Sequence, residues 1–249
     1  MKLRLLIKFS LFFILVFSWG SFAAENKAKV GVINVVDSIN VGSAEFIKRA
    51  TSESQNLGYS ALLIKLDTPG GFLEATRDIV QFLLNSEFPV IVWVSPQGAR
   101  AASAGTMITM AAHYAAMSPA TSIGAATPVS GGGKDMPEDM KKKVTNDTLS
   151  FVEGIAKKRG RNVEWAKSSV TEAASLTAEQ ALKENVIDGV HENRVDLWKS
   201  FGKKFKSDSS SSIEVQFVEI PMSLSERVLS FFSNPNVAYG LLALGALGI

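Results

Sequence analysis

Short runs of β-branched and apolar residues alternate with helical patterns in the N-terminal half of this chain, and this order most constrains its fold. The runs cover residues 30–36, 61–66 and 89–94, and each has the length of a buried strand. Between them, residues 43–57 and 72–84 carry apolar side chains at helical spacing. Because strands joined through helices pair in parallel with right-handed crossovers, the sequence predicts an α/β fold with a mostly parallel sheet and flanking helices.

Later segments predict further helices and one more strand. Ser43 is the expected N-cap of the first helix, and Thr177 begins a capping-box pattern for a short helix further on. A long helix is expected over residues 137–159, and a strand over residues 213–220. Residues 224–232 have the spacing of an amphipathic helix.

Composition removes several classes of function. The chain has 249 residues, no cysteine and two histidines, so disulfides, thiolate metal sites and a cysteine nucleophile are excluded, and no metal centre is expected. The formal net charge is +2, but Lys2, Arg4 and Lys8 all lie in the first segment, and the remainder holds 23 basic and 24 acidic residues. A nearly neutral body offers no bulk electrostatic attraction for nucleic acid.

Both ends of the chain carry apolar segments outside the α/β pattern. Residues 1–23 combine a basic start, an apolar run and small residues before Ala24, which is typical of a secretory signal, with an uncleaved anchor as the alternative. Residues 222–249 join the amphipathic helix to 13 uncharged residues from Val237, too few to span a bilayer. We interpret this tail as the start of an incomplete membrane segment, with a helix packed on the core as the alternative. Residues 24–221 form the expected exported domain.

The second predicted strand ends in Asp67-Thr68-Pro69-Gly70-Gly71, directly before a helix. Two glycines at such a junction let the backbone approach a ligand and direct N–H groups at developing negative charge. A purely structural turn is the alternative interpretation.

Ser103 follows the third predicted strand and lies among alanines at the start of a helix. This position exposes a hydroxyl at the carboxyl end of a parallel sheet, where open α/β folds bind their ligands. Its small neighbours leave room for a substrate carbonyl, and the N–H of Ala104 would face the same space. The alternative is an ordinary N-cap serine.

A nucleophilic serine needs a base. His113 lies ten residues along the same helix, roughly 15 Å from Ser103 at the standard rise, and His191 follows a turn, where a surface position is expected. A lysine serves as a base when burial lowers its pKa. Four lysines are in range: Lys134, Lys141, Lys142 and Lys143. Spacing does not choose among them, and three consecutive lysines are ordinarily a solvated helix face.

Four motifs occur in order along the chain: LDTPGG at 66–71, GARAASAGT at 98–106, TSIGAA at 121–126 and KVTND at 143–147. Together they resemble the NfeD-type membrane-bound serine proteases, in the broader Clp protease and signal peptide peptidase A class with a crotonase-like fold. The resemblance extends from about residue 30 to residue 190 and continues into the tail.

The resemblance implies a role for each motif. Ser103 would be the nucleophile and Lys143 the base, and the N–H groups of Gly71 and Ala104 would form the oxyanion hole. The residues implied in substrate binding are Gly70, Thr121, Ser122, Ile123 and Gly124. No cofactor is implied.

The implied protein is an exported, ATP-independent serine endopeptidase on the periplasmic or extracytoplasmic face of a membrane. It would cleave hydrophobic segments of membrane-associated proteins, with a stomatin-like partner, and would form a dimer or higher homo-oligomer. Full-length members of this family continue through membrane helices into a small β-barrel domain. Two alternatives stay open, a non-catalytic scaffold for a stomatin-like protein and a crotonase-like acyl-CoA enzyme. The export signal argues against the second, because coenzyme A is a cytoplasmic cofactor.

Overall fold

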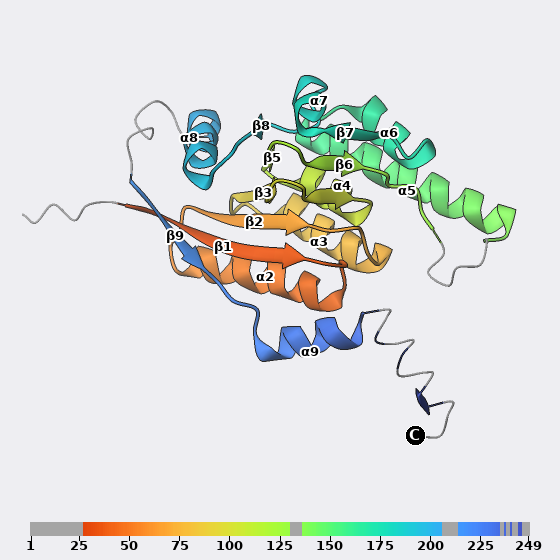
Figure 1. The fold of residues 1–249 in the computed structure, drawn as a ribbon, viewed down its shortest axis with the longest axis horizontal. Helices are drawn as coiled ribbons and strands as arrows, with labels where there is room; N and C mark the ends of the chain where they lie inside the picture. The colour runs from red at the N-terminus through yellow and green to blue at the C-terminus, as the bar shows by residue number, and fades with distance from the viewer. Residues whose placement is uncertain are drawn as a thin grey trace, which may run out of the picture.

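The computed structural model describes residues 27–129, 136–205, 214–234, 237, 240 and 244–245. Its centre is a sheet in the order β8-β5-β3-β2-β1-β9, in which all neighbours are parallel (Figure 1). These strands are β1 (Ala28–Val36), β2 (Ala61–Asp67), β3 (Val90–Val94), β5 (Tyr114–Met117), β8 (Gly189–Val190) and β9 (Val215–Glu219). A smaller sheet holds β4 (Arg100–Ala102), β6 (Ser122–Gly124) and β7 (Ser175–Thr177), with only the β6–β7 pair antiparallel. The predicted α/β fold with a mostly parallel sheet is confirmed.

Helices cover both faces of the large sheet. Those in the described residues are α2 (Val41–Asn56), α3 (Leu73–Asn85), α4 (Ala104–Ala111), α5 (Glu138–Arg159), α6 (Val163–Thr171), α7 (Ala178–Lys183), α8 (Arg194–Phe205) and α9 (Leu224–Phe232). Side chains alternate between the two faces of a strand. Ile64 of β2 therefore packs in the main core with α2 to α6, whereas its neighbour Leu63 packs in a second cluster with Trp198 of α8.

The predicted helices and strands described so far lie within two residues of their expected bounds, but the N-cap of α2 was predicted wrongly. Asn40, not Ser43, caps this helix. The Asn40 side chain accepts a hydrogen bond from the Ser43 N–H at 3.1 Å, and Ser43 Oγ accepts from the Asn40 N–H at 2.8 Å. Ser43 therefore completes the capping box three residues later. The capping box that begins at Thr177 is confirmed.

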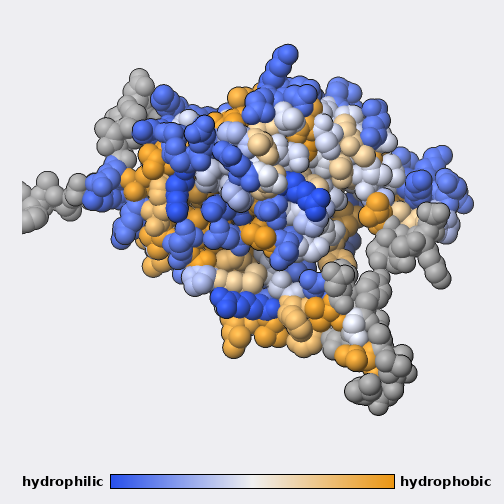
Figure 2. Space-filling view, in the orientation of Figure 1, coloured by the Kyte–Doolittle hydropathy of each residue, from blue (hydrophilic) through white to orange (hydrophobic). Residues whose placement is uncertain are grey.

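Several predictions fall on residues that the structure does not describe. These concern the signal segment 1–23, Lys134 as a candidate base, and most of residues 237–249. Within the described ranges, no helix has both the length and the apolar character needed to cross a bilayer. The amphipathic helix α9 is described in full, and apolar surface gathers over it at the lower edge of the molecule (Figure 2).

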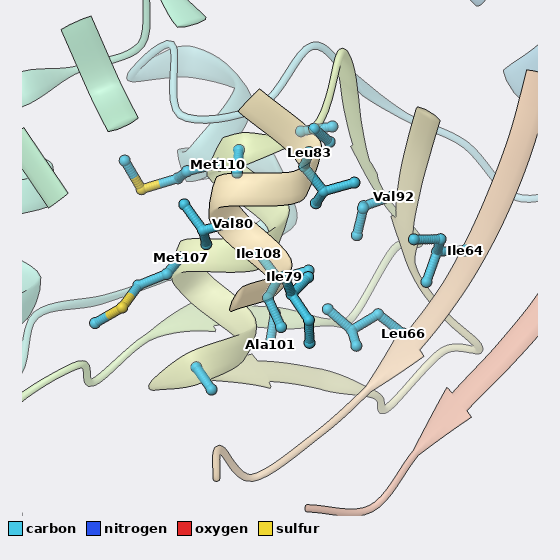
Figure 3. Packing of buried hydrophobic residues seen from close by; sticks show 14 of the residues in the cluster. Ile64, Leu66, Ile79, Val80, Leu83, Val92, Ala101, Met107, Ile108 and Met110 are labelled. Atoms are coloured by element: carbon cyan, nitrogen blue, oxygen red, sulfur yellow. The ribbon is translucent and has the colours of Figure 1, made fainter. Parts of the chain in front are cut away.

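The main core fixes α4 and therefore the residue that precedes it. Ile64, Leu66 and Val92 from the strands meet Ile79 and Leu83 of α3 across a layer of buried side chains (Figure 3). From α4, Ile108 enters this layer, and Met107 and Met110 belong to the same core cluster on the side away from the strands. Every residue of α4 is buried, which explains its short, uncharged sequence. Burying each large apolar side chain contributes about 1.5–3 kcal/mol, so α4 is a rigid platform for the site at its N-terminus.

Candidate active site

Ser103 occupies a sharp turn between strand β4 and helix α4. Its backbone has φ of +51° and ψ of −109°, a conformation that residues with a Cβ rarely adopt. The Ser103 N–H donates to the Gly124 carbonyl at 2.9 Å. Its side chain is partly exposed, and in the described part of the chain Oγ makes no hydrogen bond. Ser103 is therefore not an ordinary N-cap serine, because its hydroxyl caps nothing.

A buried threonine holds this turn in place. Thr106 Oγ1 lies 2.9 Å from the carbonyl oxygens of both Ala101 and Gly124, and it accepts a hydrogen bond from the Gly124 N–H at 3.1 Å. It thereby joins the first turn of α4 to β4 and β6, the two strands on either side of the serine turn. The sequence reasoning assigned no role to Thr106, although its place three residues after the serine was visible.

The Gly70-Gly71 turn lies against Ser103. A Cβ at Gly70, where φ is +124°, would lie 2.9 Å from Ser103 Cβ, and a Cβ at Gly71 would lie 2.1 Å from the Ile39 carbonyl oxygen. Only glycine fits at either position. Thr68 shapes the turn, because its Oγ1 accepts from the Gly70 N–H at 3.1 Å and donates to the Gly70 carbonyl at 3.0 Å.

Two backbone N–H groups beside Ser103 lack acceptors. Among the described residues, neither the Gly71 N–H nor the Ala104 N–H makes a hydrogen bond. Unpaired N–H groups at a helix N-terminus and an adjacent glycine turn form a site for developing negative charge. This is the arrangement expected of an oxyanion hole beside a nucleophile.

Ser103, Ala104 and Gly71 all line one cavity of about 310 Å³. The remaining lining residues are Ser38, Phe72, Leu73, Thr76, Met107, Ala126, Pro128, Val129, Met136, Val144 and Thr148. Most of these side chains are apolar, and they come from α3, α4, α5 and the segments that precede α3 and α5 or follow β6. The cavity therefore suits an apolar side chain of a ligand whose polar group lies at Ser103.

The predicted groove residues Thr121 to Gly124 are not among the described residues that line this cavity. Ile123 is buried in the core, and Thr121 donates its hydroxyl to the Ser118 carbonyl at 2.6 Å. Ser122 is exposed, and Gly124 accepts the hydrogen bond from Ser103. Within the described ranges, Ala126 is the member of the TSIGAA motif that reaches the cavity wall.

Lysines do not touch Ser103 in the part of the chain that the structure describes. Lys141, Lys142 and Lys143 are all exposed on the first turns of α5. The same helix sends Val144 and Thr148 into the cavity wall, so its N-terminal half borders the site.

The two histidines lie in other places. The Nδ1 atom of His113 accepts from the Val90 N–H at 3.2 Å, its Nε2 is 3.0 Å from the Ser86 carbonyl, and burial with the nearby Arg159 lowers its pKa to about 4. His191 was expected at the surface, which is wrong. It is half-buried with Nε2 3.1 Å from the Tyr114 hydroxyl, and burial lowers its pKa.

Metal ligands are not gathered near this site. Across the described ranges, no group of three or more His, Asp or Glu side chains is placed to hold an ion. Among the described residues, the cavity wall holds the hydroxyls of Ser38, Thr76, Thr148 and Ser103 and no carboxylate or imidazole. The Ser103 hydroxyl and the N–H groups of Gly71 and Ala104 are the polar groups at the serine turn. They are the parts needed for addition to a carbonyl and not for binding a divalent cation.

The parallel sheet and the serine turn before α4 define a Clp-protease-like α/β protein. ClpP1 from Listeria monocytogenes superposes with a TM-score of 0.54 and 20% identity over 67% of this chain and 94% of its own, which shows the shared fold. The family described as "NfeD1b, N-terminal domain" matches residues 29–203, and the chain belongs to this family.

Relatives of known sequence and structure agree with this assignment. The chain is 39% identical over 195 residues to membrane-bound protease PH1510 of Pyrococcus horikoshii, covering 74% of this chain and 44% of that protein. It is 25% identical over 240 residues to membrane protein NfeD1b of Bacillus subtilis, covering 91% and 51%. The chain thus spans about half the length of these curated relatives.

A solved structure of the 1510-N membrane-bound stomatin-specific protease, a lysine-to-alanine mutant in complex with a substrate peptide, superposes with a TM-score of 0.72. The identity is 31%, and the match covers 84% of this chain and 99% of that one. The serine-to-alanine mutant of the same protease superposes with a TM-score of 0.70 and 32% identity, over 79% and 99% of the two chains.

Proposed function

We propose that this chain is a serine endopeptidase that cleaves apolar polypeptide segments through an acyl-enzyme on Ser103. The observation that carries the proposal is the juxtaposition, in one apolar cavity, of a strained serine and two unpaired backbone N–H groups, those of Gly71 and Ala104. The similarity to a membrane-bound protease points to the same chemistry.

The proposed reaction begins with Ser103 Oγ attacking the peptide carbonyl while a base removes its proton. The carbonyl oxygen becomes an oxyanion that accepts hydrogen bonds from Gly71 and Ala104, which contribute about 2.7–4 kcal/mol each to the transition state. The protonated base then gives its proton to the amine leaving group, and the C–N bond breaks. Water, deprotonated by the same base, releases the acyl group and restores Ser103.

We assign the base to Lys143. In the 1510-N protease, the replaced serine and the replaced lysine lie 41 positions apart, and Ser103 and Lys143 lie 40 positions apart in this chain. Lys141 and Lys142 fit that spacing less well. Because Lys143 is exposed in the free protein, the proposal requires its side chain to turn toward Ser103 and to be shielded from water when a substrate covers the site.

The substrate class follows from the cavity and from the relatives. Phe72, Met107 and Val144 offer apolar contacts to a substrate side chain, and the related protease is described as stomatin-specific. A stomatin-like membrane protein is therefore the proposed partner. Membrane association follows the two membrane-protein relatives, and export through residues 1–23, the extracytoplasmic face and a homo-oligomer remain predictions from sequence.

The test is cleavage of an apolar fluorogenic peptide by the full chain in detergent. Ser103→Ala should abolish turnover, and Lys143→Ala should lower kcat by about 10²–10⁴, the usual contribution of a general base. Lys141→Ala, Lys142→Ala and Lys134→Ala are matched controls and should keep wild-type rates. If Lys143→Ala is fully active while a control variant is inactive, the assignment of the base is wrong.

The competing functions make different predictions in the same assay. A scaffold for a stomatin-like protein would leave the folded wild type inert toward every peptide and would keep its cellular role after Ser103→Ala. An acyl-CoA enzyme would bind to immobilised coenzyme A. The two unpaired N–H groups and the strained backbone of Ser103 favour the peptidase over the scaffold, because a scaffold needs neither of them.

A further inference from the structure

Helix α9 is amphipathic in the direction opposite to that of an ordinary surface helix. Glu226 is its buried residue, 5% exposed, whereas Phe231 and Phe232 are 57% and 59% exposed. Leu224, Val228 and Leu229 are exposed as well. Figure 2 shows this apolar surface along the edge of the molecule formed by α9. A helix normally buries its apolar side, so this orientation needs an explanation.

Polar contacts hold α9 in this orientation. Arg49 of α2 donates from Nε to Glu226 Oε1 at 2.6 Å and from Nη2 to Glu226 Oε2 at 3.0 Å. Asn40 Nδ2 donates to Ser230 Oγ at 3.0 Å. The backbones also meet closely, because a Cβ at Gly42 would lie 2.5 Å from the Ser230 nitrogen. Rotating the helix about its axis to bury Phe231 and Phe232 would break all of these contacts. The packing of α9 on α2 therefore keeps the apolar face exposed.

The exposed face has the size and setting of a membrane contact. Its five side chains expose on the order of 500 Å², if each fully exposed side chain offers about 150–250 Å². That is as large as the largest patches on typical monomers, and it is below the roughly 800 Å² per partner of a stable dimer. The sequence continues from Val237 with 13 uncharged residues, so the apolar character of the face continues along the chain. A bilayer surface explains both features better than a second copy does.

The same face is tied to the wall of the active-site cavity. Asn40 Nδ2, which binds Ser230 of α9, also lies 3.2 Å from the carbonyl oxygen of Ser38, and Ser38 lines the cavity. The next residue, Ile39, accepts the Phe72 N–H at 2.9 Å beside the glycine turn. One short segment therefore separates α9 from the proposed oxyanion hole.

We propose that α9 lies in the interfacial layer of a bilayer and holds the mouth of the Ser103 cavity at the membrane surface. The cavity then receives an apolar stretch of polypeptide as it leaves the bilayer. The location of α9 rests on its packing, its exposed apolar face and the uncharged sequence that follows it, whereas the statement about the substrate rests on the proposed peptidase function.

The location is tested by spin labels on the full chain, which has no cysteine of its own. Val228→Cys and Phe231→Cys place labels on the outward face, Val41→Cys places one next to Asn40, and Lys183→Cys on α7 is the control on the opposite side in Figure 1. The labelled proteins are added to vesicles of phosphatidylcholine and phosphatidylglycerol, and collision with oxygen and with an aqueous nickel chelate is measured.

We expect Val228 and Phe231 labels about 5–10 Å below the headgroups, shielded from nickel and accessible to oxygen. The Val41 label should have intermediate exposure to nickel, and the Lys183 label should be fully aqueous. Nickel accessibility at Val228 equal to that at Lys183 would overturn the proposal. So would shielding from both reagents with dipolar broadening between labels, which indicates a second copy.

A second measurement addresses the substrate. Phe231→Ser combined with Phe232→Ser should leave cleavage of a soluble peptide unchanged and reduce cleavage of the same peptide anchored in vesicles at least tenfold. Phe205→Ser, the same change at an exposed phenylalanine of α8, is the matched control and should affect neither. Equal cleavage of both substrates by the double variant would contradict the substrate claim. If the wild type cleaves neither, the peptidase function fails, while the spin labels still decide where α9 and the cavity mouth lie.

Discussion

Replacing Gly71 by alanine tests the proposed oxyanion hole through the backbone alone. The added Cβ would lie 2.1 Å from the Ile39 carbonyl oxygen and 2.5 Å from the Ile39 nitrogen. Carbon and oxygen atoms need more than 3 Å, and both clashing atoms belong to the backbone, so they cannot rotate away. The turn must therefore move by about 1 Å, and the Gly71 N–H moves with it.

The expected loss of activity follows from this displacement. Losing one oxyanion donor lowers kcat by about 10²–10³, or about 2.7–4 kcal/mol of transition-state stabilisation. A misplacement of about 1 Å in a catalytic group has a similar effect, about 10². We therefore expect Gly71→Ala to retain at most about one hundredth of the wild-type kcat, with Ser103 still present.

The assay is steady-state hydrolysis of an apolar fluorogenic peptide, with thermal unfolding measured in parallel. Gly154→Ala on α5 is the matched control, because a Cβ at Gly154 meets nothing within 4 Å and alanine favours the helix. It should keep its activity and gain about 0.5–1 kcal/mol of stability. A folded Gly71→Ala protein with wild-type kcat would refute the assignment of Gly71 to the oxyanion hole.

Three further variants test other parts of the account. Ser103→Gly should be inactive but about 1 kcal/mol more stable than Ser103→Ala in urea unfolding, because glycine adopts the φ of +51° without strain. Equal stabilities of the two variants would show that the turn is unstrained. Thr148→Val should raise the free energy of unfolding in urea by about 1 kcal/mol or more, since the buried Thr148 Oγ1 has no hydrogen-bond partner among the described residues. A lower free energy of unfolding would reveal a partner. Burial lowers the pKa of His113 from 6.5 to about 4, so His113 binds its proton more readily in the unfolded state. The free energy of unfolding should therefore be highest above pH 6.5 and should fall as the pH drops from 6.5 toward 4. His113→Gln should flatten this dependence by about 1–2 kcal/mol after solvent screening, and an unchanged pH profile would contradict the lowered pKa.

Much of the fold was predictable because its signals are local. The short apolar runs that became β1, β2 and β3 are buried on both faces over residues 30–33, 61–64 and 90–94, and such strands need little beyond their own composition to be recognised. The helix stop at Gly58 was likewise visible, since its φ of +69° favours glycine.

The wrong predictions concern side chains whose partners are not evident from the local sequence. Asn40 and Ser43 are both good cap residues, and only the fold shows that the helix begins at the first of them. His191 is half-buried because Tyr114 from a distant strand lies against it, and nothing in its local sequence indicates that contact.

The candidate site was also predictable only in part. The Gly70-Gly71 turn follows β2 of the large sheet, and Ser103 and Ala104 follow β4 of the smaller one. The parallel bridge between Thr68 and Ala101 brings the two turns together. The choice among the lysines depends on which side chain is desolvated, and neither spacing nor helix periodicity determines that. Thr148 entered the cavity wall from α5, where its polar side chain gave no sign of burial.

The central claim is that Ser103 is a nucleophile, and covalent labelling tests it most directly. A fluorophosphonate reacts with an activated serine by forming an O–P bond and releasing fluoride. We predict a single adduct in the intact mass of the wild-type chain, located at Ser103 by peptide mapping and lost in Ser103→Ala. A folded wild-type protein that takes no label, or takes it at another residue, would contradict the account.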